Sequence, residues 1–294
     1  MSSHSPDEGT KAATRKPSEL GLRIASALVL IAVTLAITIA GGVAFQVFCA
    51  LGALLIVYEY AGIVHDRPAA PANWPLCFAL IAVLAVYFVW GAAACLVTLL
   101  VMTAALAAAD VFRGRKFWDA AGLGYAALPF LALVLLRGDT RIGLDAVLFL
   151  FACVWGADTF AYFAGRRIGG PKLAPAISPN KTWSGLAGGL AGAVLAGLIV
   201  LYLAGYRLAP MLAGLALILA LASVAGDLLE SWLKRRFGKK DSGRTIPGHG
   251  GILDRVDGLL VAAFVFWLAG IAGGAPMFAA GSAGETLLRA FQLP

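Results

Sequence analysis

Acidic and basic side chains share one face of a single apolar segment. Asp227, Glu230, Ser231 and Lys234 stand at positions i, i+3, i+4 and i+7, so they line one side of a helix. A helix surrounded by lipid would not carry such a face, because ionisable groups in apolar surroundings usually border a polar cavity. We therefore expect this helix to lie beside a wet cavity.

Charge is concentrated where this helix ends. Only 13% of all residues are charged, yet seven basic and four acidic residues fall between positions 230 and 257. Membrane topology alone needs about two or three basic residues at a helix end, so we expect an anionic ligand as a second cause. The residues are Lys234, Arg235, Arg236, Lys239, Lys240, Arg244 and Arg255, with Glu230, Asp241, Asp254 and Asp257.

A glycine-rich turn lies within this charged stretch. Gly248, Gly250 and Gly251 surround His249, so successive backbone N–H groups could converge on an anion. We expect His249 to belong to this turn and not to act as a general base. Asp254 and Asp257 follow, three residues apart and so on one face of a new helix. A flexible hairpin with a capping Asp is the simpler alternative, but it leaves the clustered charges unexplained.

A second polar segment reads Ser178-Pro179-Asn180-Lys181-Thr182. Ser178 and Thr182 can each cap a helix, and capping alone would explain them. Lys181 at a helix N-terminus is also a suitable place for a phosphate. The segment lacks the glycine spacing of a Walker A loop. Both interpretations, capping and phosphate binding, stay open.

Two further acids fall within apolar segments. Asp158 and Tyr162 are one turn apart and share a face, which fits a polar cavity or a hydrogen bond between helices. Glu59 stands between Tyr58 and Tyr60, which fits an interfacial acid as well as a cavity-lining one.

Carboxylates beside clustered Lys and Arg suggest a divalent metal with a polyphosphate. Oxygen ligands suit Mg²⁺, and Asp227 and Asp254 are the ligands that we expect. Phosphoryl or nucleotidyl transfer then requires mainly positioning and charge stabilisation.

Apolar helices must position these residues. Hydrophobic residues make up 61% of the 294, against roughly 45–50% in soluble domains, which excludes an ordinary soluble enzyme, a disordered chain and a fibrous protein. Cys49, Cys77, Cys95 and Cys153 lie in apolar runs and predict neither disulfides nor a zinc site. The sequence predicts an all-α polytopic membrane protein of about nine transmembrane helices, with a polar cavity open to the cytoplasm. The predicted spans are 22–41, 43–64, 74–92, 93–110, 120–137, 143–164, 185–206, 209–229 and 258–274.

The chain divides into four predicted parts. Residues 1–20 form a polar, disordered cytoplasmic tail, and 21–140 hold the N-terminal helices. Residues 141–275 hold the catalytic helices and cytoplasmic loops, and 276–294 form a C-terminal tail. Only residues 90–93 separate the third and fourth spans.

The basic residues predict the orientation of the spans. With a cytoplasmic N-terminus, all of the 23 Lys and Arg residues except Arg137, Arg141, Arg207 and Arg289 fall on the cytoplasmic side. This asymmetry explains most of the net charge of +7 without a nucleic-acid partner.

The stretch 231–257 resembles the full signature of the phosphatidate cytidylyltransferase (CDP-diacylglycerol synthase) family, without gap or mismatch. Asp158-Thr159, Tyr162 and Gly165-Arg166, together with 178–182, resemble the family's second conserved block. The N-terminal helices match only in hydropathy, apart from Glu59. The family often has an acid where this chain has Ser184, and Asp158 or Glu230 could compensate for it.

The resemblance implies transfer of CMP from CTP to phosphatidate, which yields CDP-diacylglycerol and pyrophosphate in phospholipid biosynthesis. It also implies Mg²⁺, a second monovalent cation such as K⁺, a homodimer, and a site facing the cytoplasm in a bacterial inner membrane. The expected catalytic residues are Asp227, Asp254, Lys234, Arg235, Lys240, Asp241 and Asp257, with Asp227 and Asp254 on the metal. The expected substrate-binding residues are Ser178, Asn180, Lys181, Thr182, His249, Gly250, Gly251, Arg255, Asp158 and Tyr162.

Two alternatives are distinguishable. A CTP-dependent lipid kinase would use a similar site but release CDP in place of pyrophosphate. A transporter could also have buried acids in a wet cavity, but it predicts internal repeats, and residues 20–140 do not echo 140–275.

Overall fold

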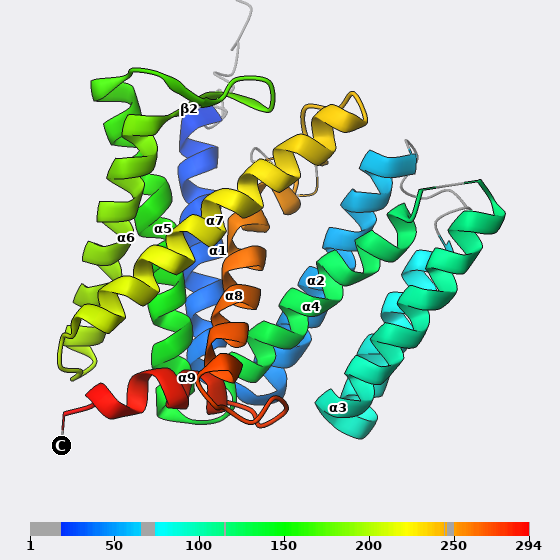
Figure 1. Ribbon diagram of the computed structural model, residues 1–294, viewed down its shortest axis with the longest axis horizontal. Coiled ribbons are helices and arrows are strands. Elements are labelled where there is room, and N and C mark those ends of the chain that lie inside the picture. Colours follow the sequence, from blue (N-terminus) through cyan, green and yellow to red (C-terminus); the bar gives the residue numbers. More distant parts are fainter. Residues whose placement is uncertain (1–18, 66–73, 115, 244, 246–249, 294) are drawn as a thin grey trace, which may run out of the picture.

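The structure is a computed structural model that describes residues 19–65, 74–114, 116–243, 245 and 250–293, and the side chains from residue 26 onward. The described chain is almost entirely helical, and most long helices lie side by side with their loops at two opposite ends (Figure 1). The elements are α1 (Glu19–Ala40), α2 (Gly42–His65), α3 (Trp74–Phe112), α4 (Trp118–Arg137), α5 (Arg141–Ile168), β1 (Lys172–Ala174), β2 (Ser178–Thr182), α6 (Trp183–Leu203), α7 (Pro210–Arg236), α8 (Leu253–Ala272), α9 (Ser282–Leu288) and η2 (Arg289–Phe291).

Seven helices in the described part, α2 to α8, are long and apolar enough to cross a membrane. The described apolar part of α1, from Ser26 to Ala40, is shorter. These helices confirm an integral, polytopic membrane protein. The predicted tail 1–20 lies outside the described residues except for its last two positions, where α1 begins.

Helix α3 contains a break at Gly91. A straight helix of its 39 residues would be roughly 58 Å long, about twice the apolar thickness of a bilayer. Gly91 adopts φ 81° and ψ −173°, a conformation that glycine reaches because it lacks a Cβ atom. The break falls within residues 90–93, where the sequence predicts the boundary between two spans.

Helices α5 and α6 approach closely along a seam of small residues. An added Cβ at Gly188 would lie 2.3 Å from Ala164 Cβ, and one at Gly192 would lie 2.4 Å from Phe160 Cβ. Glycine in such a seam lets two helix backbones pack tightly within a membrane. The seam fixes the start of α6 beside α5, the helix that carries Asp158.

A two-stranded hairpin precedes α6, which the all-α prediction missed. In this antiparallel pair Lys172 is opposite Thr182, and Ala174 is opposite Ser178. The prediction of a helix cap at Ser178 is therefore wrong, because Ser178 begins a strand. Thr182 does cap α6, since its hydroxyl accepts a hydrogen bond from Gly185 N at 3.0 Å.

The C-terminal tail is docked at the opposite end of the molecule, where α9 lies (Figure 1). Gly281 N donates to Leu135 O at 2.6 Å, and Leu293 N donates to Gly205 O at 2.8 Å. Nearby, the buried Arg137 guanidinium donates to Thr38 O at 2.7 Å. These contacts tie the tail and the ends of α1 and α4 into the helical bundle.

Candidate active site

The crossing of α7 and α8 brings two predicted acids to one place. An added Cβ at Gly226 would lie 2.5 Å from the Asp257 carbonyl oxygen, and one at Gly258 would lie 2.4 Å from Ser223 Oγ. A methyl group at either position would force a neighbouring atom to shift. The two glycines therefore allow the helices to approach closely at the positions next to Asp227 and Asp257.

Asp227 joins α7 to the segment before α6. Lys181 Nζ lies 2.7 Å from Asp227 Oδ2, and Ser231 Oγ donates to Asp227 Oδ1 at 3.3 Å. Lys181 is in β2, so the hairpin positions it beside α7. The structure thus places the two polar segments singled out by the sequence in direct contact.

Two further carboxylates belong to this cluster. Asp158 of α5 and Asp257 of α8 each interact electrostatically with Asp227 and Lys181. Three carboxylates therefore surround one lysine, and hard oxygen donors suit Mg²⁺. The charge and donor type fit a divalent cation, although nowhere in the described chain are three acidic, His or Cys side chains already arranged around a metal position.

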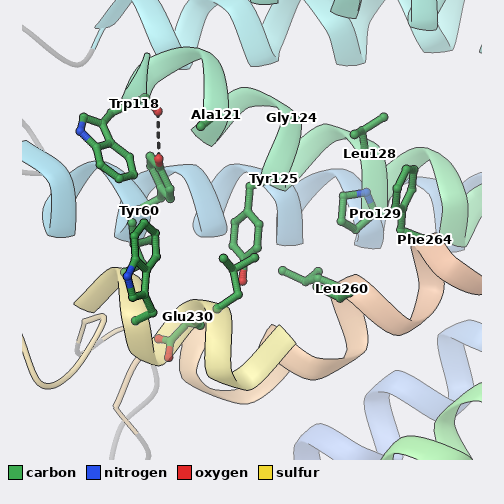
Figure 2. A pocket seen from close by; sticks show the side chains of 14 residues that line it. Tyr60, Trp118, Ala121, Gly124, Tyr125, Leu128, Pro129, Glu230, Leu260 and Phe264 are labelled. Atoms are coloured by element: carbon green, nitrogen blue, oxygen red, sulfur yellow. Dashed lines mark hydrogen bonds between the residues drawn. The ribbon is translucent and has the colours of Figure 1, made fainter. Parts of the chain in front are cut away.

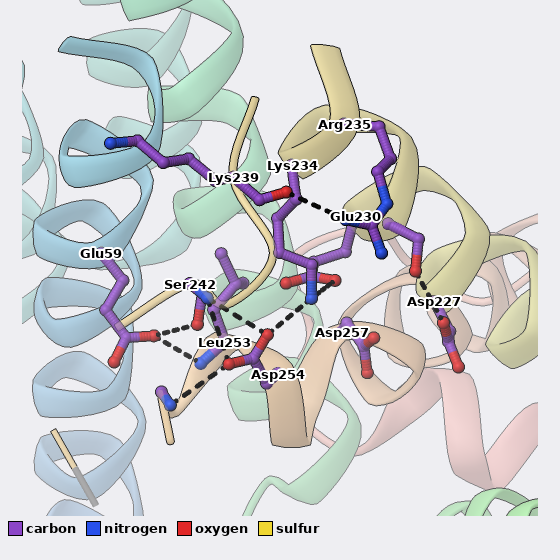
Figure 3. Close-up of polar contacts among 12 residues, drawn as sticks. Glu59, Asp227, Glu230, Lys234, Arg235, Lys239, Ser242, Leu253, Asp254 and Asp257 are labelled. Carbon is purple, nitrogen blue, oxygen red and sulfur yellow. Dashed lines mark hydrogen bonds and ion pairs between the residues drawn. The ribbon is translucent and has the colours of Figure 1, made fainter. Parts of the chain in front are cut away.

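Asp254 has a separate set of partners. Its Oδ1 accepts from Lys234 Nζ at 2.6 Å, and its Oδ2 accepts from Ser242 N and Gly251 N at 3.2 Å each (Figure 3). Both oxygens are thereby engaged in holding the loop before α8. The expected metal pair of Asp227 and Asp254 is not joined by any of these contacts.

Lys234 lies between two acids. Its Nζ is 2.6 Å from Glu230 Oε2 and 2.6 Å from Asp254 Oδ1, and its side chain is 12% exposed. The face predicted from the spacing along α7 is present, but its basic end already pairs with carboxylates (Figure 3).

Glu59 of α2 is the functional candidate whose partners the sequence did not reveal. Its buried carboxylate accepts from Leu253 N at 2.8 Å, Ile252 N at 2.9 Å and Ser242 Oγ at 3.0 Å, and also from the Thr245 hydroxyl. Glu59 therefore anchors the loop between α7 and α8 (Figure 3). The sequence offered two signals for Glu59, its place within an apolar segment and its resemblance to the family.

Glycine is required where this loop passes Glu59. An added Cβ at Gly251 would lie 2.6 Å from Glu59 Oε2, and one at Gly243 would lie 2.9 Å from Glu59 Oε1. Gly251 thus allows close packing against Glu59. The sequence had assigned this glycine to anion binding. Gly250 has φ +83°, a left-handed conformation that favours glycine.

The structure gives fewer contacts for the remaining predicted residues. Tyr162 accepts a hydrogen bond from Arg166 Nη1 at 2.6 Å and is exposed. His249 and Gly248 lie outside the described residues, so the predicted anion-binding turn stays a prediction. Five further predicted site residues are exposed, namely Asn180, Arg235, Lys240, Asp241 and Arg255.

Ser184, which stands where the resemblance leads us to expect an acid, has a structural role. Its hydroxyl donates to Gly169 O and lies 3.0 Å from Thr182 Oγ1. It links the end of α5 to the start of α6.

Comparisons with known proteins find similar sequences along most of the chain. Residues 21–271 match the Cytidylyltransferase family. The chain is 45% identical over 254 residues to the phosphatidate cytidylyltransferases of Brucella abortus biovar 1 (strain 9-941) and Brucella melitensis biotype 1, covering 86% of this chain and 94% of each relative. The phosphatidate cytidylyltransferase of Staphylococcus aureus (strain COL) is 43% identical over 150 residues, covering 49% of this chain and 56% of that one.

Proposed function

The chain belongs to the cytidylyltransferase family, and from this premise we propose that it transfers CMP from CTP to phosphatidate, giving CDP-diacylglycerol and pyrophosphate. It is a membrane-embedded nucleotidyltransferase of phospholipid biosynthesis. The observation that carries this function is the likeness to phosphatidate cytidylyltransferases over 86% of the chain. The family match over residues 21–271 includes every element of the candidate site.

The reaction exchanges one bond for another. An oxygen of the phosphatidate phosphate forms a bond to the α-phosphorus of CTP, and the bond from that phosphorus to the oxygen bridging the β-phosphate breaks. The bonding electrons leave with pyrophosphate. The nucleophile is already anionic at neutral pH, so the protein needs to position it and balance charge, with no general base.

The acidic cluster is the proposed Mg²⁺ site. We assign Asp227 as a ligand, as the sequence suggested. We assign Asp257 as the second because it interacts with Asp227, whereas Asp254 pairs with Lys234 and holds the loop before α8. Asp158 adds negative charge from α5. The ion would neutralise and orient the CTP phosphates. A second, monovalent cation such as K⁺ stays a prediction, tested by activity when K⁺ is replaced by choline.

Basic residues around this cluster are the proposed phosphate ligands. Lys181 is held at the cluster by Asp227 and would exchange this partner for a substrate phosphate. Arg235, Lys240 and Arg255 are exposed, and we assign them to the leaving pyrophosphate. Lys234 stays between its two acids and positions Asp254. We retain the remaining expected binding residues, namely Ser178, Asn180, Thr182, Tyr162, His249, Gly250 and Gly251, for the substrates, with Asp241 at the site's edge.

The arrangement of the helices in the membrane is also proposed. We propose nine spans, with α3 counted as two and α1 as one, a cytoplasmic N-terminus, and a site in a cavity that faces the cytoplasm of a bacterial inner membrane. Bacterial relatives and the distribution of Lys and Arg support this orientation. The expected homodimer is tested by light scattering of the detergent-solubilised protein.

Product identity tests the function. The purified protein is incubated in detergent micelles with Mg²⁺, phosphatidate and CTP labelled on either the α- or the γ-phosphorus. The α-label is expected in the lipid and the γ-label in pyrophosphate. Release of CDP with the γ-label in the lipid would establish a lipid kinase and refute the proposal.

A further inference from the structure

An apolar pocket of about 400 Å³ opens between α4, α7 and α8 (Figure 2). Most of its lining is aliphatic or aromatic, including Leu128, Leu260 and Phe264. All three helices are apolar enough to cross the membrane. The pocket therefore lies among membrane-spanning segments and not in a water-exposed loop.

Two polar atoms in this pocket are buried without a hydrogen-bond partner among the described residues. They are the Tyr125 hydroxyl and Glu230 Oε1. A third candidate is satisfied, because the Tyr60 hydroxyl donates to Trp118 O at 2.9 Å. Buried polar atoms are nearly always hydrogen-bonded, so the unpartnered Tyr125 hydroxyl indicates that a molecule with a hydrogen-bond acceptor occupies the pocket. Tyr125 points from α4 toward α7, on the side where Glu230 lies (Figure 2).

The pocket and the candidate active site share a wall. Glu230 lines the pocket, and its Oε2 lies 2.6 Å from Lys234 Nζ, which in turn contacts Asp254. At the same end, the rings of Trp118 and Trp232 lie 6.1 Å apart, and aromatic residues of this kind are typical of the membrane interface. A molecule in the pocket could thus extend from apolar surroundings to the phosphate-binding region.

We propose that this pocket holds the glycerol-ester region and the first part of one acyl chain of the phosphatidate substrate. The Tyr125 hydroxyl donates a hydrogen bond to an ester carbonyl of the lipid. Lipid tails are as apolar as the pocket lining, so the pocket contributes little driving force and acts by aligning the lipid phosphate with the Asp227 cluster. This inference rests on the proposed function.

Gly124 offers a way to fill the pocket without strain. It lines the pocket, and an added Cβ there would meet nothing within 4 Å. Leu at position 124 would occupy space that the lipid needs, so Gly124→Leu is expected to raise the KM for dioleoyl phosphatidate about tenfold. The KM for CTP should stay unchanged. Gly214→Leu is the matched control, because Gly214 of α7 also has open space and lies outside the pocket lining.

Tyr125→Phe tests the hydrogen bond, since it removes only the hydroxyl. The variant is expected to lose roughly three- to tenfold in kcat/KM for ester-linked phosphatidate. An ether-linked phosphatidate lacks the carbonyl acceptor, so the wild type and Tyr125→Phe should turn it over equally.

The outcomes separate the two proposals. Wild-type protein that transfers no CMP to phosphatidate would refute the proposed function and this subsite with it. Active wild-type protein with unchanged phosphatidate kinetics in both variants would refute the subsite alone and assign the pocket to ordinary bilayer lipid. The same loss for ester and ether substrates would refute the hydrogen bond to the carbonyl.

Discussion

A buried carboxylate in the N-terminal half of the chain holds the loop that carries most of the predicted site residues. Removing an ionised group from water is costly unless hydrogen bonds compensate for it. Glu59 meets this condition with two backbone N–H groups, from Ile252 and Leu253, and two hydroxyls, from Ser242 and Thr245. Its role is to position the loop and not to contact the reacting atoms.

Glu59→Gln should therefore weaken the loop while keeping the side-chain volume. The amide NH₂ group would face donors and leave about two of them unsatisfied, at a cost of roughly 1–3 kcal/mol in the free energy of unfolding. Thermal unfolding of the solubilised protein should show the loss, and kcat should fall more than the KM for CTP rises. Glu285→Gln, in α9 at the other end, is the control. Unchanged unfolding and kcat in Glu59→Gln would contradict the anchoring role.

Residue-level inference from sequence succeeded where partners are close along the chain. The contact between Glu230 and Lys234 follows from their i, i+4 spacing. The partners of Glu59 lie more than 180 positions away, and no local pattern identifies them. The same limit explains Asp254, because its loop contacts exist only once α7 and α8 are packed.

At the scale of elements, glycine determines how near α7 and α8 approach. Gly226→Ala and Gly258→Ala would each place a methyl group within 2.5 Å of an oxygen on the neighbouring helix. We expect each to cost about 1–3 kcal/mol and to lower CMP transfer by separating Asp227 from Asp257. Gly214→Ala in α7 is the matched control, since its Cβ meets nothing within 4 Å. Wild-type stability and activity in both test variants would show that the crossing tolerates the change.

The start of α6 provides a second element-level prediction. Thr182→Ala removes the side-chain cap on Gly185 N and should cost about 1 kcal/mol. Because Thr182 follows Lys181, the KM for CTP or phosphatidate should also rise. Thr182→Ser keeps the hydroxyl and should behave as wild type in both unfolding and kinetics. Equal effects of the two substitutions would contradict a role as a helix cap.

Helix positions were largely predictable and the hairpin was not. Apolar runs of spanning length predicted α2 and α4 to α8 within a few residues, apart from the polar extensions at the end of α7 and the start of α8. At those two ends the helix continues through polar residues, which the search for apolar runs could not recognise. The hairpin is too short for a periodic pattern, and its turn around Pro175, closed by Ile177 N to Ala174 O at 3.1 Å, looked like a loop before a helix.

At the scale of the whole molecule, the short connecting elements lie at two opposite ends of the helical bundle. The hairpin lies at one end of the bundle and α9 at the other (Figure 1), in agreement with the proposed orientation. Lys172→Cys in β1 should react with a membrane-impermeant maleimide only in inside-out vesicles. Arg289→Cys, beyond α9, should react only in right-side-out vesicles. The opposite pattern would reverse the topology, and the protein with only its four native cysteines gives the background.

The central claim is that CMP transfer takes place at the carboxylate cluster around Asp227. The most direct measurement is transfer of α-labelled CMP to phosphatidate across a Mg²⁺ titration, for the wild type and three Asp→Asn variants. Asp227→Asn should lose at least about 100-fold in kcat, and Asp257→Asn should require more Mg²⁺ for half-maximal rate. Asp254→Asn should lower kcat without shifting the Mg²⁺ midpoint. Wild-type turnover and Mg²⁺ dependence in Asp227→Asn would contradict the account.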